Sequence, residues 1–224
     1  MFYDYSKGEK MIPKKIHYFW FGQGTMGALS EKCLKSWSEK MPDYEINLWN
    51  ESNLPYEASL AWTYIKKKEY AFASDFARYY ILHKYGGIYL DTDVEVIRKF
   101  DDLLSNKCFL GYEDDGRLNS AVIGAEKSSS FVEICMDIMK KNHADNRPYL
   151  IAPELANRAL EVACSNVTTY PKDYFYPYNP YSKKENVKQL LYCDITENTY
   201  SIHHWEKKWK MNIFSKIKRM FISN

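Results

Sequence analysis

Apolar residues follow two different periods along the chain, and together they predict alternating strands and helices. Residues 16–21 and 44–49 have the aliphatic and aromatic character of strands. They flank residues 28–40, where Cys33 and Trp37 lie four positions apart, as on one face of a helix. A strand, a helix and a strand in this order predict a parallel strand pair in an α/β sheet.

The remaining pattern extends this architecture along the chain. Further helices are expected at 57–67, 69–85, 129–141 and 153–164, and further strands at 88–96, 108–113 and 119–125. Gly86 and Gly87 suit the end of the helix at 69–85. Residues 170–184, rich in Tyr and Pro, are expected to form a loop that either lines an acceptor cleft or covers the sheet edge. We therefore predict one α/β domain over residues 1–210, with a mostly parallel central sheet flanked by helices.

Composition agrees with a globular domain and argues against a general affinity for nucleic acid. The chain has 224 residues, of which 46% are hydrophobic and 27% charged, and its net charge is only +2. A chain of this length can bury on the order of 70% of its unfolded surface. Aromatic residues make up 17% of the chain, with 20 Tyr and 6 Trp, which suits either a flat polar ligand such as a sugar or base, or a Tyr-rich core.

Cysteine usage and hydropathy bear on the cellular compartment. The 5 cysteines are widely spread and form no Cys-x-x-Cys pair, so neither a disulfide framework nor a zinc cluster is indicated. Residues 1–10 lack the apolar core of a signal peptide, and no apolar run approaches the roughly 18 residues of a membrane span. We therefore expect a cytoplasmic protein.

Two aspartates, Asp91 and Asp93, follow the apolar residues 88–90 in one of the expected strands. Because side chains alternate along a strand, both carboxylates should point to one side, at the carboxyl end where open α/β sheets bind ligands. Adjacent anions repel one another unless a cation lies between them. Mg²⁺ or Mn²⁺, held by carboxylates and by the phosphate oxygens of a substrate, is the favoured partner. Two solvated acids in a turn are the alternative interpretation.

The preceding helix adds a second pair of charged residues, Asp75 and Arg78, three positions apart. Such a pair is either a surface ion pair, which contributes a few tenths of a kcal/mol, or part of a ligand site. In a ligand site, the Arg78 fork would grip a diphosphate, and Asp75 would accept hydrogen bonds from sugar hydroxyls.

At this point the sequence resembles a known family. The block ASDFARYYILHKYGGIYLDTDVEV (73–96) is similar to the signature of GT-A-fold glycosyltransferases, in the family 32-like group. That group includes bacterial capsular polysaccharide sugar transferases, yeast-type initiating α-mannosyltransferases and the catalytic domains of clostridial glucosylating toxins. The segments IPKKIHYFWFGQG, KCLKSWSEKMPDYEINLWNE and YSIHHWEKKW extend the resemblance from residue 12 to residue 209. The implied fold is a Rossmann-like GT-A domain.

The resemblance implies a role for each matching residue. Asp91 and Asp93 would hold the metal that bridges the diphosphate, with His203, or the adjacent His204, as a third ligand. Lys208 stands where the family often has Ser, which affects the geometry expected of this closing segment. By the same resemblance, Asp75, Arg78 and Asp91 would contact the donor sugar and phosphate, and Asn119 would face the donor sugar. Trp20 would stack on the nucleobase, and Trp209 would lie near the leaving phosphate.

The implied activity is metal-dependent transfer of a sugar from a nucleoside-diphosphate sugar to a hydroxyl of a saccharide acceptor. By analogy with the family, UDP is the first choice of nucleotide and GDP the second, the anomeric configuration is retained, and the setting is bacterial capsular polysaccharide or lipopolysaccharide synthesis. Asp114, Asp115 and Glu154 are candidate acids on the acceptor side, each with an ordinary surface or helix-start charge as the alternative.

Other functions use similar motifs. The loop GQGTMG (22–27), with Glu51 near the end of the second strand, resembles the dinucleotide fingerprint of an NAD-dependent oxidoreductase, although the bulky Trp20 and Phe21 precede its first glycine. A haloacid-dehalogenase-type phosphatase also has an Asp-x-Asp motif, but Glu95 occupies the position where that family has Thr or Val. A non-catalytic sugar-binding protein of the same fold is the third alternative.

The last residues, 211–224, are predicted to form a basic amphipathic tail. Apolar side chains recur at helical spacing beside Lys and Arg, so the tail would either lie on an anionic membrane surface or pack against the domain. The membrane hypothesis places the protein peripherally on the inner face of the cell membrane, close to a lipid-linked acceptor.

Overall fold

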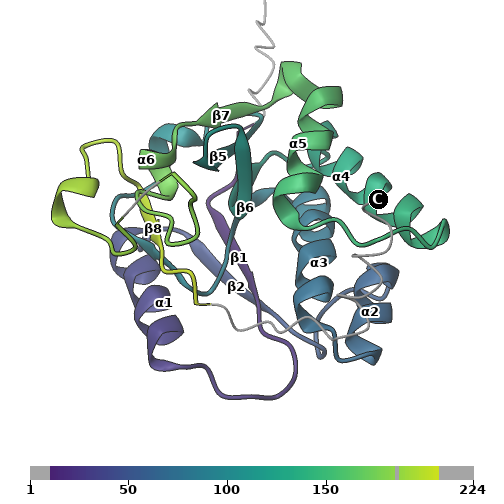
Figure 1. The fold of residues 1–224 in the computed structure, drawn as a ribbon. Coiled ribbons are helices and arrows are strands. Elements are labelled where there is room, and N and C mark those ends of the chain that lie inside the picture. Colours follow the sequence, from purple (N-terminus) through teal and green to yellow (C-terminus); the bar gives the residue numbers. More distant parts are fainter. Residues whose placement is uncertain (1–10, 185–186, 207–224) are drawn as a thin grey trace, which may run out of the picture.

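A six-stranded sheet, in the order β2-β1-β3-β6-β5-β7, forms the centre of the computed structural model, which describes residues 11–184 and 187–206 (Figure 1). Its strands are β1 (Lys15–Phe19), β2 (Glu45–Trp49), β3 (Gly87–Leu90), β5 (Cys108–Asp114), β6 (Arg117–Ala125) and β7 (Thr168–Tyr170). β1 pairs in parallel with β2 and β3, and β5 pairs in parallel with β7, while β6 lies antiparallel between β3 and β5. The prediction of a mostly parallel sheet is confirmed.

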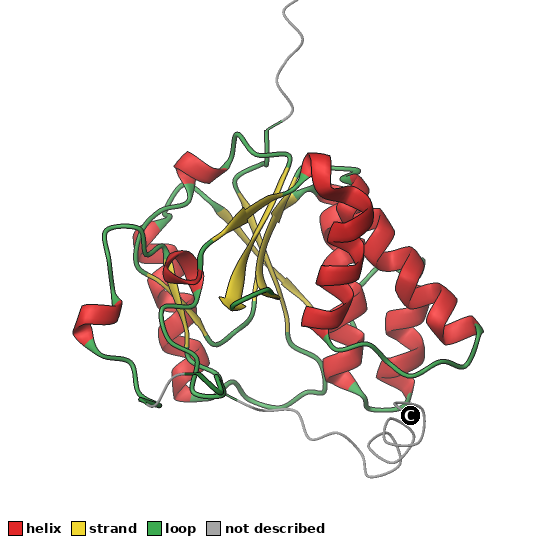
Figure 2. Ribbon diagram, turned by 45° about the horizontal axis from the view of Figure 1, so that its top comes forward, coloured by secondary structure: helices red, strands yellow, loops and turns green. Residues whose placement is uncertain are grey.

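Helices cover both faces of this sheet (Figures 1 and 2). One face carries α2 (Ser59–Lys66), α3 (Tyr70–Tyr85), α4 (Ser130–Ala144) and α5 (Ala152–Ala163). The other face carries α1 (Ala28–Lys40), the short α6 (Lys172–Phe175), and a small antiparallel sheet of β4 (Val94–Val96) and β8 (Ser201–His203). The connecting 3₁₀ turns are η1 (Asp101–Leu103), η2 (Cys164–Asn166) and η3 (Tyr192–Asp194).

Each face of the sheet has its own apolar core. Leu110 and Ile123 belong to the cluster under α2–α5, whereas their neighbours Phe109 and Val122 belong to the cluster under α1 and α6. This alternation is the strand period of two, and it makes β5 and β6 apolar on both faces. Burial of each such side chain contributes about 1.5–3 kcal/mol, so the central strands form a rigid support for the segments at their ends.

Helix α1 anchors the small sheet. Cys33 and Trp37, predicted to lie on its inner face, are 1% and 0% exposed. The Trp37 indole N–H donates a hydrogen bond of 2.7 Å to the Val94 carbonyl. Because Val94 is the first residue of β4, this bond ties the helix to the turn that carries the two aspartates.

The end of α3 needs the two glycines that follow it. Gly86 has a φ of 65° and Gly87 a φ of 114°, a region that side chains disfavour. A Cβ on Gly87 would lie 2.7 Å from the Lys15 carbonyl oxygen of β1. Glycine therefore lets the chain leave α3 and enter β3 directly against β1.

His17, on β1, is a buried histidine with both ring nitrogens paired. The Trp49 indole N–H donates to its Nδ1 at 3.1 Å, so the proton lies on Nε2, which is 2.9 Å from the Gly86 carbonyl oxygen. Burial, with a smaller contribution from Lys15, lowers the pKa of His17 to about 4, although the bond to Gly86 opposes this shift. His17 is thus a neutral structural residue.

Two expectations need revision. The predicted strand over 88–96 is wrong as a single strand, because β3 ends at Leu90, residues 91–93 turn, and β4 begins at Val94 in a different sheet. The Tyr- and Pro-rich segment 170–184 is not wholly a loop, since it includes the end of β7 and all of α6.

Within residues 11–184 and 187–206, no helix has the length and apolar character needed to cross a membrane. The predicted tail at 211–224 lies outside the described residues.

Candidate active site

Asp91, Asp93 and His203 converge beyond the end of β3. One ligand atom of each lies within 4.8 Å of the others, although Asp91 and Asp93 belong to a turn and not to one strand. The turn closes through a 3.0 Å bond from the Val94 N–H to the Asp91 carbonyl. His203 joins the aspartates because β8 pairs with β4, in a register that sets His203 opposite Val94. These carboxylate and imidazole groups are the types of donor that hold a divalent cation.

Asp93 is held from several directions. Its Oδ1 lies 3.3 Å from His203 Nε2, and its Oδ2 accepts a 2.8 Å bond from the Glu206 N–H. Burial raises the pKa of Asp93, but the bond and charge of His203 and the Glu206 N–H outweigh it, so the pKa lies below its ordinary value. For His203, burial is likewise outweighed by Asp93, and its pKa is raised. Asp93 is therefore fixed as an anion.

The two adjacent histidines have different surroundings. His203 is 7% exposed and faces Asp93, whereas His204 Nε2 lies 2.8 Å from Glu95 Oε2 on the outer side of the small sheet. The structure thus places His203, and not His204, beside the aspartates. Its role as a metal ligand stays a prediction.

Asp75 and Arg78 do not form a surface ion pair. Arg78 Nη2 lies 2.6 Å from Asp75 Oδ1, and the two side chains are only 6% and 18% exposed. The Tyr149 hydroxyl, from the loop after α4, donates to the other oxygen of Asp75. Burial raises the pKa of Asp75, against the opposing effects of Arg78 and Tyr149.

Arg78 also reaches the turn that carries Asp91 and Asp93. Its Nη2 lies 3.5 Å from Asp91 Oδ1, its Nη1 donates to the Ser120 carbonyl at 2.8 Å, and its guanidinium lies 4.4 Å from the centre of the Tyr89 ring. Burial lowers the pKa of Arg78, but Tyr89, Asp91 and Asp75 raise it well above its ordinary value. The Tyr89 hydroxyl donates to the same Asp91 carboxylate. Arg78 therefore lies beneath the site and orients Asp91, whose side chain is 29% exposed.

Asn119 lies at the same edge of the sheet, at the start of β6, with a partner that the sequence did not indicate. Its side-chain N–H donates to the carboxylate of Glu113, and its Oδ1 accepts a 2.7 Å bond from the Ala121 N–H. Glu113 is 5% exposed and also receives the Arg117 guanidinium. The pairing of β5 with β6 shifts register between Tyr112 and Asp114, so Glu113 lies in a bulge, a feature that often turns a side chain toward a site.

Trp20 follows β1, and its indole N–H donates to the Gly24 carbonyl at 2.6 Å. In the glycine loop, Gly22 has a φ of 87°, and a Cβ there would lie 2.5 Å from the Tyr70 ring. Glu51 accepts a 2.7 Å bond from the Gly22 N–H. The residues of the apparent dinucleotide fingerprint thus shape the loop around Trp20.

The candidate acceptor-side acids hold neighbouring segments together. Asp114 accepts a 2.8 Å bond from the Ser182 hydroxyl, and Asp115 pairs with Lys184 at 2.6 Å. Glu154 lies at the start of α5, 3.3 Å from the Ile151 N–H. Trp209 and Lys208 lie outside the described residues.

Sequence reasoning missed Glu113, Tyr149 and Trp205, whose ring centre lies 4.3 Å from that of His203. The position of Trp205 directly after the two histidines could have indicated it. Glu113 and Tyr149 carry no local signal, because a β-bulge and a loop between two helices bring them to the site.

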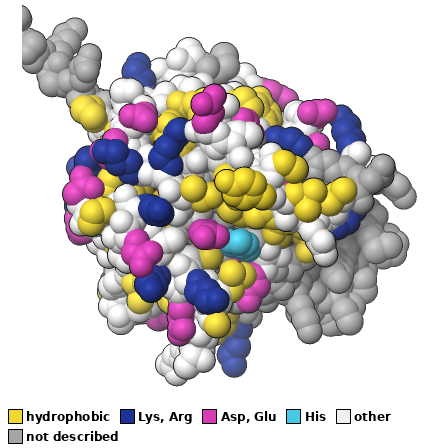
Figure 3. Space-filling view, turned by 90° about the vertical axis from the view of Figure 1, so that its left-hand side faces the viewer, with side chains coloured by type: hydrophobic (Ala, Val, Ile, Leu, Met, Phe, Trp, Pro, Cys, Tyr) yellow, Lys and Arg dark blue, Asp and Glu magenta, His cyan; other side chains and the backbone are white. Residues whose placement is uncertain are grey.

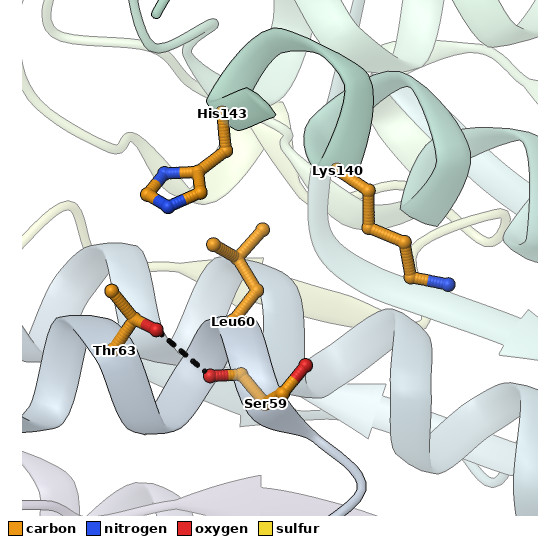
Figure 4. Close-up of a pocket in the computed structure, with 5 residues that line it drawn as sticks. All are labelled: Ser59, Leu60, Thr63, Lys140 and His143. Atoms are coloured by element: carbon orange, nitrogen blue, oxygen red, sulfur yellow. Dashed lines mark hydrogen bonds between the residues drawn. The ribbon is translucent and has the colours of Figure 1, made fainter. Parts of the chain in front are cut away.

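A separate pocket of about 170 Å³ lies between α2 and α4 (Figure 4). Ser59, Leu60, Thr63, Lys140 and His143 line it, and the Thr63 hydroxyl donates to the Ser59 carbonyl at 3.0 Å. None of the predicted site residues lines this pocket.

Comparison with known proteins finds a family that matches part of the chain, and several similar enzymes. Residues 27–110 match the family described as "Glycosyltransferase sugar-binding region containing DXD motif". Inositol phosphoceramide mannosyltransferase 3 of Schizosaccharomyces pombe is 32% identical over 57% of this chain and 37% of its own length. Lactosylceramide 4-alpha-galactosyltransferase of Homo sapiens is 28% identical over 67% of this chain and 46% of its own length. The chain thus spans less than half the length of these relatives.

Solved structures share the fold at low sequence identity. The PaToxG glycosyltransferase has a TM-score of 0.60 at 19% identity, covering 68% of this chain and 70% of its own. The galactosyltransferase LgtC, solved with donor and acceptor sugar analogs, has a TM-score of 0.53 at 15% identity and covers 93% of this chain and 94% of its own. The predicted GT-A fold is confirmed, and residues 27–110 of this chain are similar to the family of the glycosyltransferase sugar-binding region that contains the DXD motif.

Proposed function

We propose that this protein transfers a sugar from a nucleoside-diphosphate sugar to a hydroxyl of a saccharide acceptor. UDP-sugar is the preferred donor in this proposal and GDP-sugar the second choice. The observation that carries it is the convergence of Asp91, Asp93 and His203 within 4.8 Å, at the sheet edge where the family motif lies. A UDP-bound toxin glycosyltransferase domain, with a TM-score of 0.54 at 10% identity, shares this fold, and its nucleotide is in line with the preference for UDP.

The three side chains fit a divalent cation. They supply two carboxylates from the turn after β3 and an imidazole from the end of β8. The buried Nδ1 of His203 has no hydrogen-bond partner among the described residues. Mn²⁺ or Mg²⁺ bound there would act as a Lewis acid that stabilises charge on the departing diphosphate.

The protein's own groups provide binding and orientation. Arg78 and Tyr89 hold Asp91, while His203 and the Glu206 N–H hold Asp93, so both carboxylates are preorganised for the donor. Asn119, fixed by Glu113, is proposed to face the donor sugar, and Trp20 to stack on the nucleobase. The proposed contact of Trp209 with the leaving phosphate rests on the sequence resemblance, as does retention of configuration.

The acceptor is proposed to be a saccharide carried on a lipid. Two relatives are named for inositol phosphoceramide and for lactosylceramide, both glycolipid or lipid acceptors by name.

The face shown in Figure 3 mixes Lys and Arg with Asp and Glu and gathers apolar side chains in a band, without the stripe of positive charge that nucleic acid binds. Synthesis of bacterial surface polysaccharide, with the protein peripheral on the inner face of the cell membrane, remains the proposed setting on the sequence resemblance alone.

The test is the melting temperature of the full chain with UDP, GDP or NAD, each with Mn²⁺ or with EDTA. Binding to the folded state raises the melting temperature by mass action, by an amount equivalent to about 2.7 kcal/mol at one hundred times the Kd. We expect UDP to stabilise the protein only with Mn²⁺, and Asp93→Asn to remove the effect. Asp137→Asn, at an acid on α4 whose side chain is 67% exposed, is the matched control and should behave as wild type.

Two results would contradict the proposal. If NAD stabilises the protein without metal and neither UDP nor GDP has an effect, the glycine loop at 22–27 is a dinucleotide site and the proposal is wrong. The protein could also bind nucleotide only with metal and yet fail to hydrolyse UDP-sugars or GDP-sugars, even slowly. That result would favour a non-catalytic sugar-binding protein.

A further inference from the structure

Trp205 is held beside the proposed metal site in an unusual backbone conformation. Its φ is 59°, a value that a bulky side chain rarely adopts and that occurs mainly where function or packing imposes it. Its ring centre lies 4.3 Å from that of His203, and its indole N–H donates a 2.9 Å bond to the Tyr178 carbonyl. The backbone turn also directs the next N–H, that of Glu206, at Asp93. The position of the Trp205 ring is therefore linked to the geometry of the site.

Tyr178 and Tyr181, from the Tyr- and Pro-rich segment, extend this surface. The Tyr181 ring meets Trp205 edge to face at 6.0 Å and is 50% exposed. The Tyr178 hydroxyl donates to the His204 carbonyl at 3.4 Å. Burial, with the nearby charge of Asp93, raises the pKa of Tyr178, which agrees with a ring close to the turn that carries Asp91 and Asp93. We call these three residues, Tyr178, Tyr181 and Trp205, the aromatic wall.

The segment that carries Tyr178 and Tyr181 is fixed to the hairpin of β5 and β6. Ser182 binds Asp114, Lys184 binds Asp115, and the Asn179 side-chain N–H donates to the Glu113 carbonyl at 3.4 Å. Behind the aromatic wall, the buried Tyr176 hydroxyl accepts a 3.0 Å bond from the Val122 N–H of β6. The wall is thus a preformed surface, joined to the strands that carry Glu113 and Asn119.

The order of the strands separates the aromatic wall from the nucleobase end of the site. Trp20 follows β1, which lies between β2 and β3, whereas β6 and β5 lie on the other side of β3. A donor that spans from Trp20 across Asp91 would place its sugar toward β6. A group beyond that sugar would meet the aromatic wall.

We infer that Tyr178, Tyr181 and Trp205 form the subsite for the acceptor sugar, with a pyranose ring stacked against the exposed aromatic surface beside the metal site. Sugars present an apolar face of C–H groups, and Tyr and Trp combine an apolar ring with a polar edge, so the two surfaces are complementary. The inference rests on the proposed function and adds the location of the acceptor.

Saturation-transfer difference NMR of the full chain with UDP and Mg²⁺ tests the inference. The probes are lactose and methyl α-mannoside, because the acceptor sugar itself is unknown. We expect wild-type protein to bind at least one probe, with the strongest saturation on the C–H groups of one ring face. Tyr181→Ala should weaken sugar binding by roughly threefold to tenfold, the range that one aromatic contact provides.

Variants make the result specific. Tyr181→Phe keeps the ring and should retain most of the affinity, while Tyr192→Ala, at a tyrosine that is 92% exposed outside the aromatic wall, should bind sugar as wild type does. Trp205→Phe is the second wall variant and should also weaken binding. No binding of either sugar by wild type, or equal binding by wild type and Tyr181→Ala, would overturn the inference. UDP binding is measured in a separate experiment, by the melting temperature with metal. If the wild-type protein does not bind UDP there, the proposed function itself fails, and not only the acceptor subsite.

Discussion

Arg78 is a buried cation between two carboxylates, so its first role is electrostatic support. Removing one partner of a buried pair leaves an uncompensated charge, which costs about 3–5 kcal/mol. We expect Arg78→Ala to lower the free energy of unfolding by about 3 kcal/mol, measured by urea denaturation, because Asp75 and Asp91 would lose their common partner. Lys35→Ala, which breaks the exposed pair with Glu39, is the control and should change little.

The same variant separates two roles for Arg78. An exposed arginine that only grips the diphosphate would lose nucleotide affinity when mutated but leave stability unchanged. That outcome would contradict the buried, positioning role described above.

His17 gives the domain a dependence on acid that is independent of the proposed site. Its folded pKa is about 4, against 6.5 for an unperturbed histidine, so the unfolded state binds the proton first as the pH falls. Stability from this residue is therefore complete above about pH 7 and declines until about pH 4, by on the order of 3 kcal/mol. Protonation is unfavourable chiefly because the ring is buried, and a protonated Nδ1 would also direct an N–H at the Trp49 indole N–H.

Urea denaturation of wild type and His17→Gln at pH 7 and pH 4.5 tests this dependence. We expect wild type to lose more stability than the variant over this interval, because Gln does not titrate. Equal losses in both proteins would show that other groups account for the acid sensitivity.

At the scale of secondary-structure elements, the junction from α3 to β3 depends on glycine. We expect Gly87→Ala to be more destabilising than Gly116→Ala. Both positions have positive φ, which costs a residue other than glycine about 1–2 kcal/mol in the left-handed region of Gly116 (φ 65°) and at least as much at Gly87 (φ 114°). Of the two, only Gly87 would bring a Cβ against backbone, at 2.7 Å from the Lys15 oxygen. The additional cost of overpacking is roughly 1–3 kcal/mol, measurable as a difference in urea midpoint. Equal losses of stability in the two variants would contradict this, because β1 and β3 would then move apart around the new Cβ without a loss of free energy of unfolding.

The elements themselves were largely predictable from sequence, because most follow one clear period. Residues 28–40 were expected to be helical and form α1 (Ala28–Lys40), with Cys33 and Trp37 inside. The break after Leu90 was not predicted, since Val94 and Val96 continue the apolar alternation although β4 pairs with β8 and not with the central sheet. Asp91 and Asp93 were thus expected to converge through strand alternation, whereas a turn brings them together.

The contacts that complete the site belong to the scale of the whole molecule. Tyr149 reaches Asp75 across 74 positions of sequence, and Glu206 reaches Asp93 across 113. No local pattern encodes such pairs, so burial of Arg78 and the partner of Asn119 could not be predicted. The resemblance to a family supplied His203 and Asn119 where periodicity alone had no signal.

Because the proposed metal site joins β4 to β8, binding of UDP and metal should stabilise these distant segments together. We expect hydrogen exchange to slow at residues 91–96 and 199–205 when UDP and Mg²⁺ are added, since local separation of Asp93 from His203 would then require loss of the ligand. Helix α5 (Ala152–Ala163), which supplies none of the three proposed metal ligands, should show a smaller change. Mass spectrometry of the full chain measures both regions in one experiment, with Asp93→Asn as the control that should show no ligand effect. Slowing at 91–96 without slowing at 199–205 would mean that His203 takes no part in the site and that Asp91 and Asp93 bind the ligand without β8.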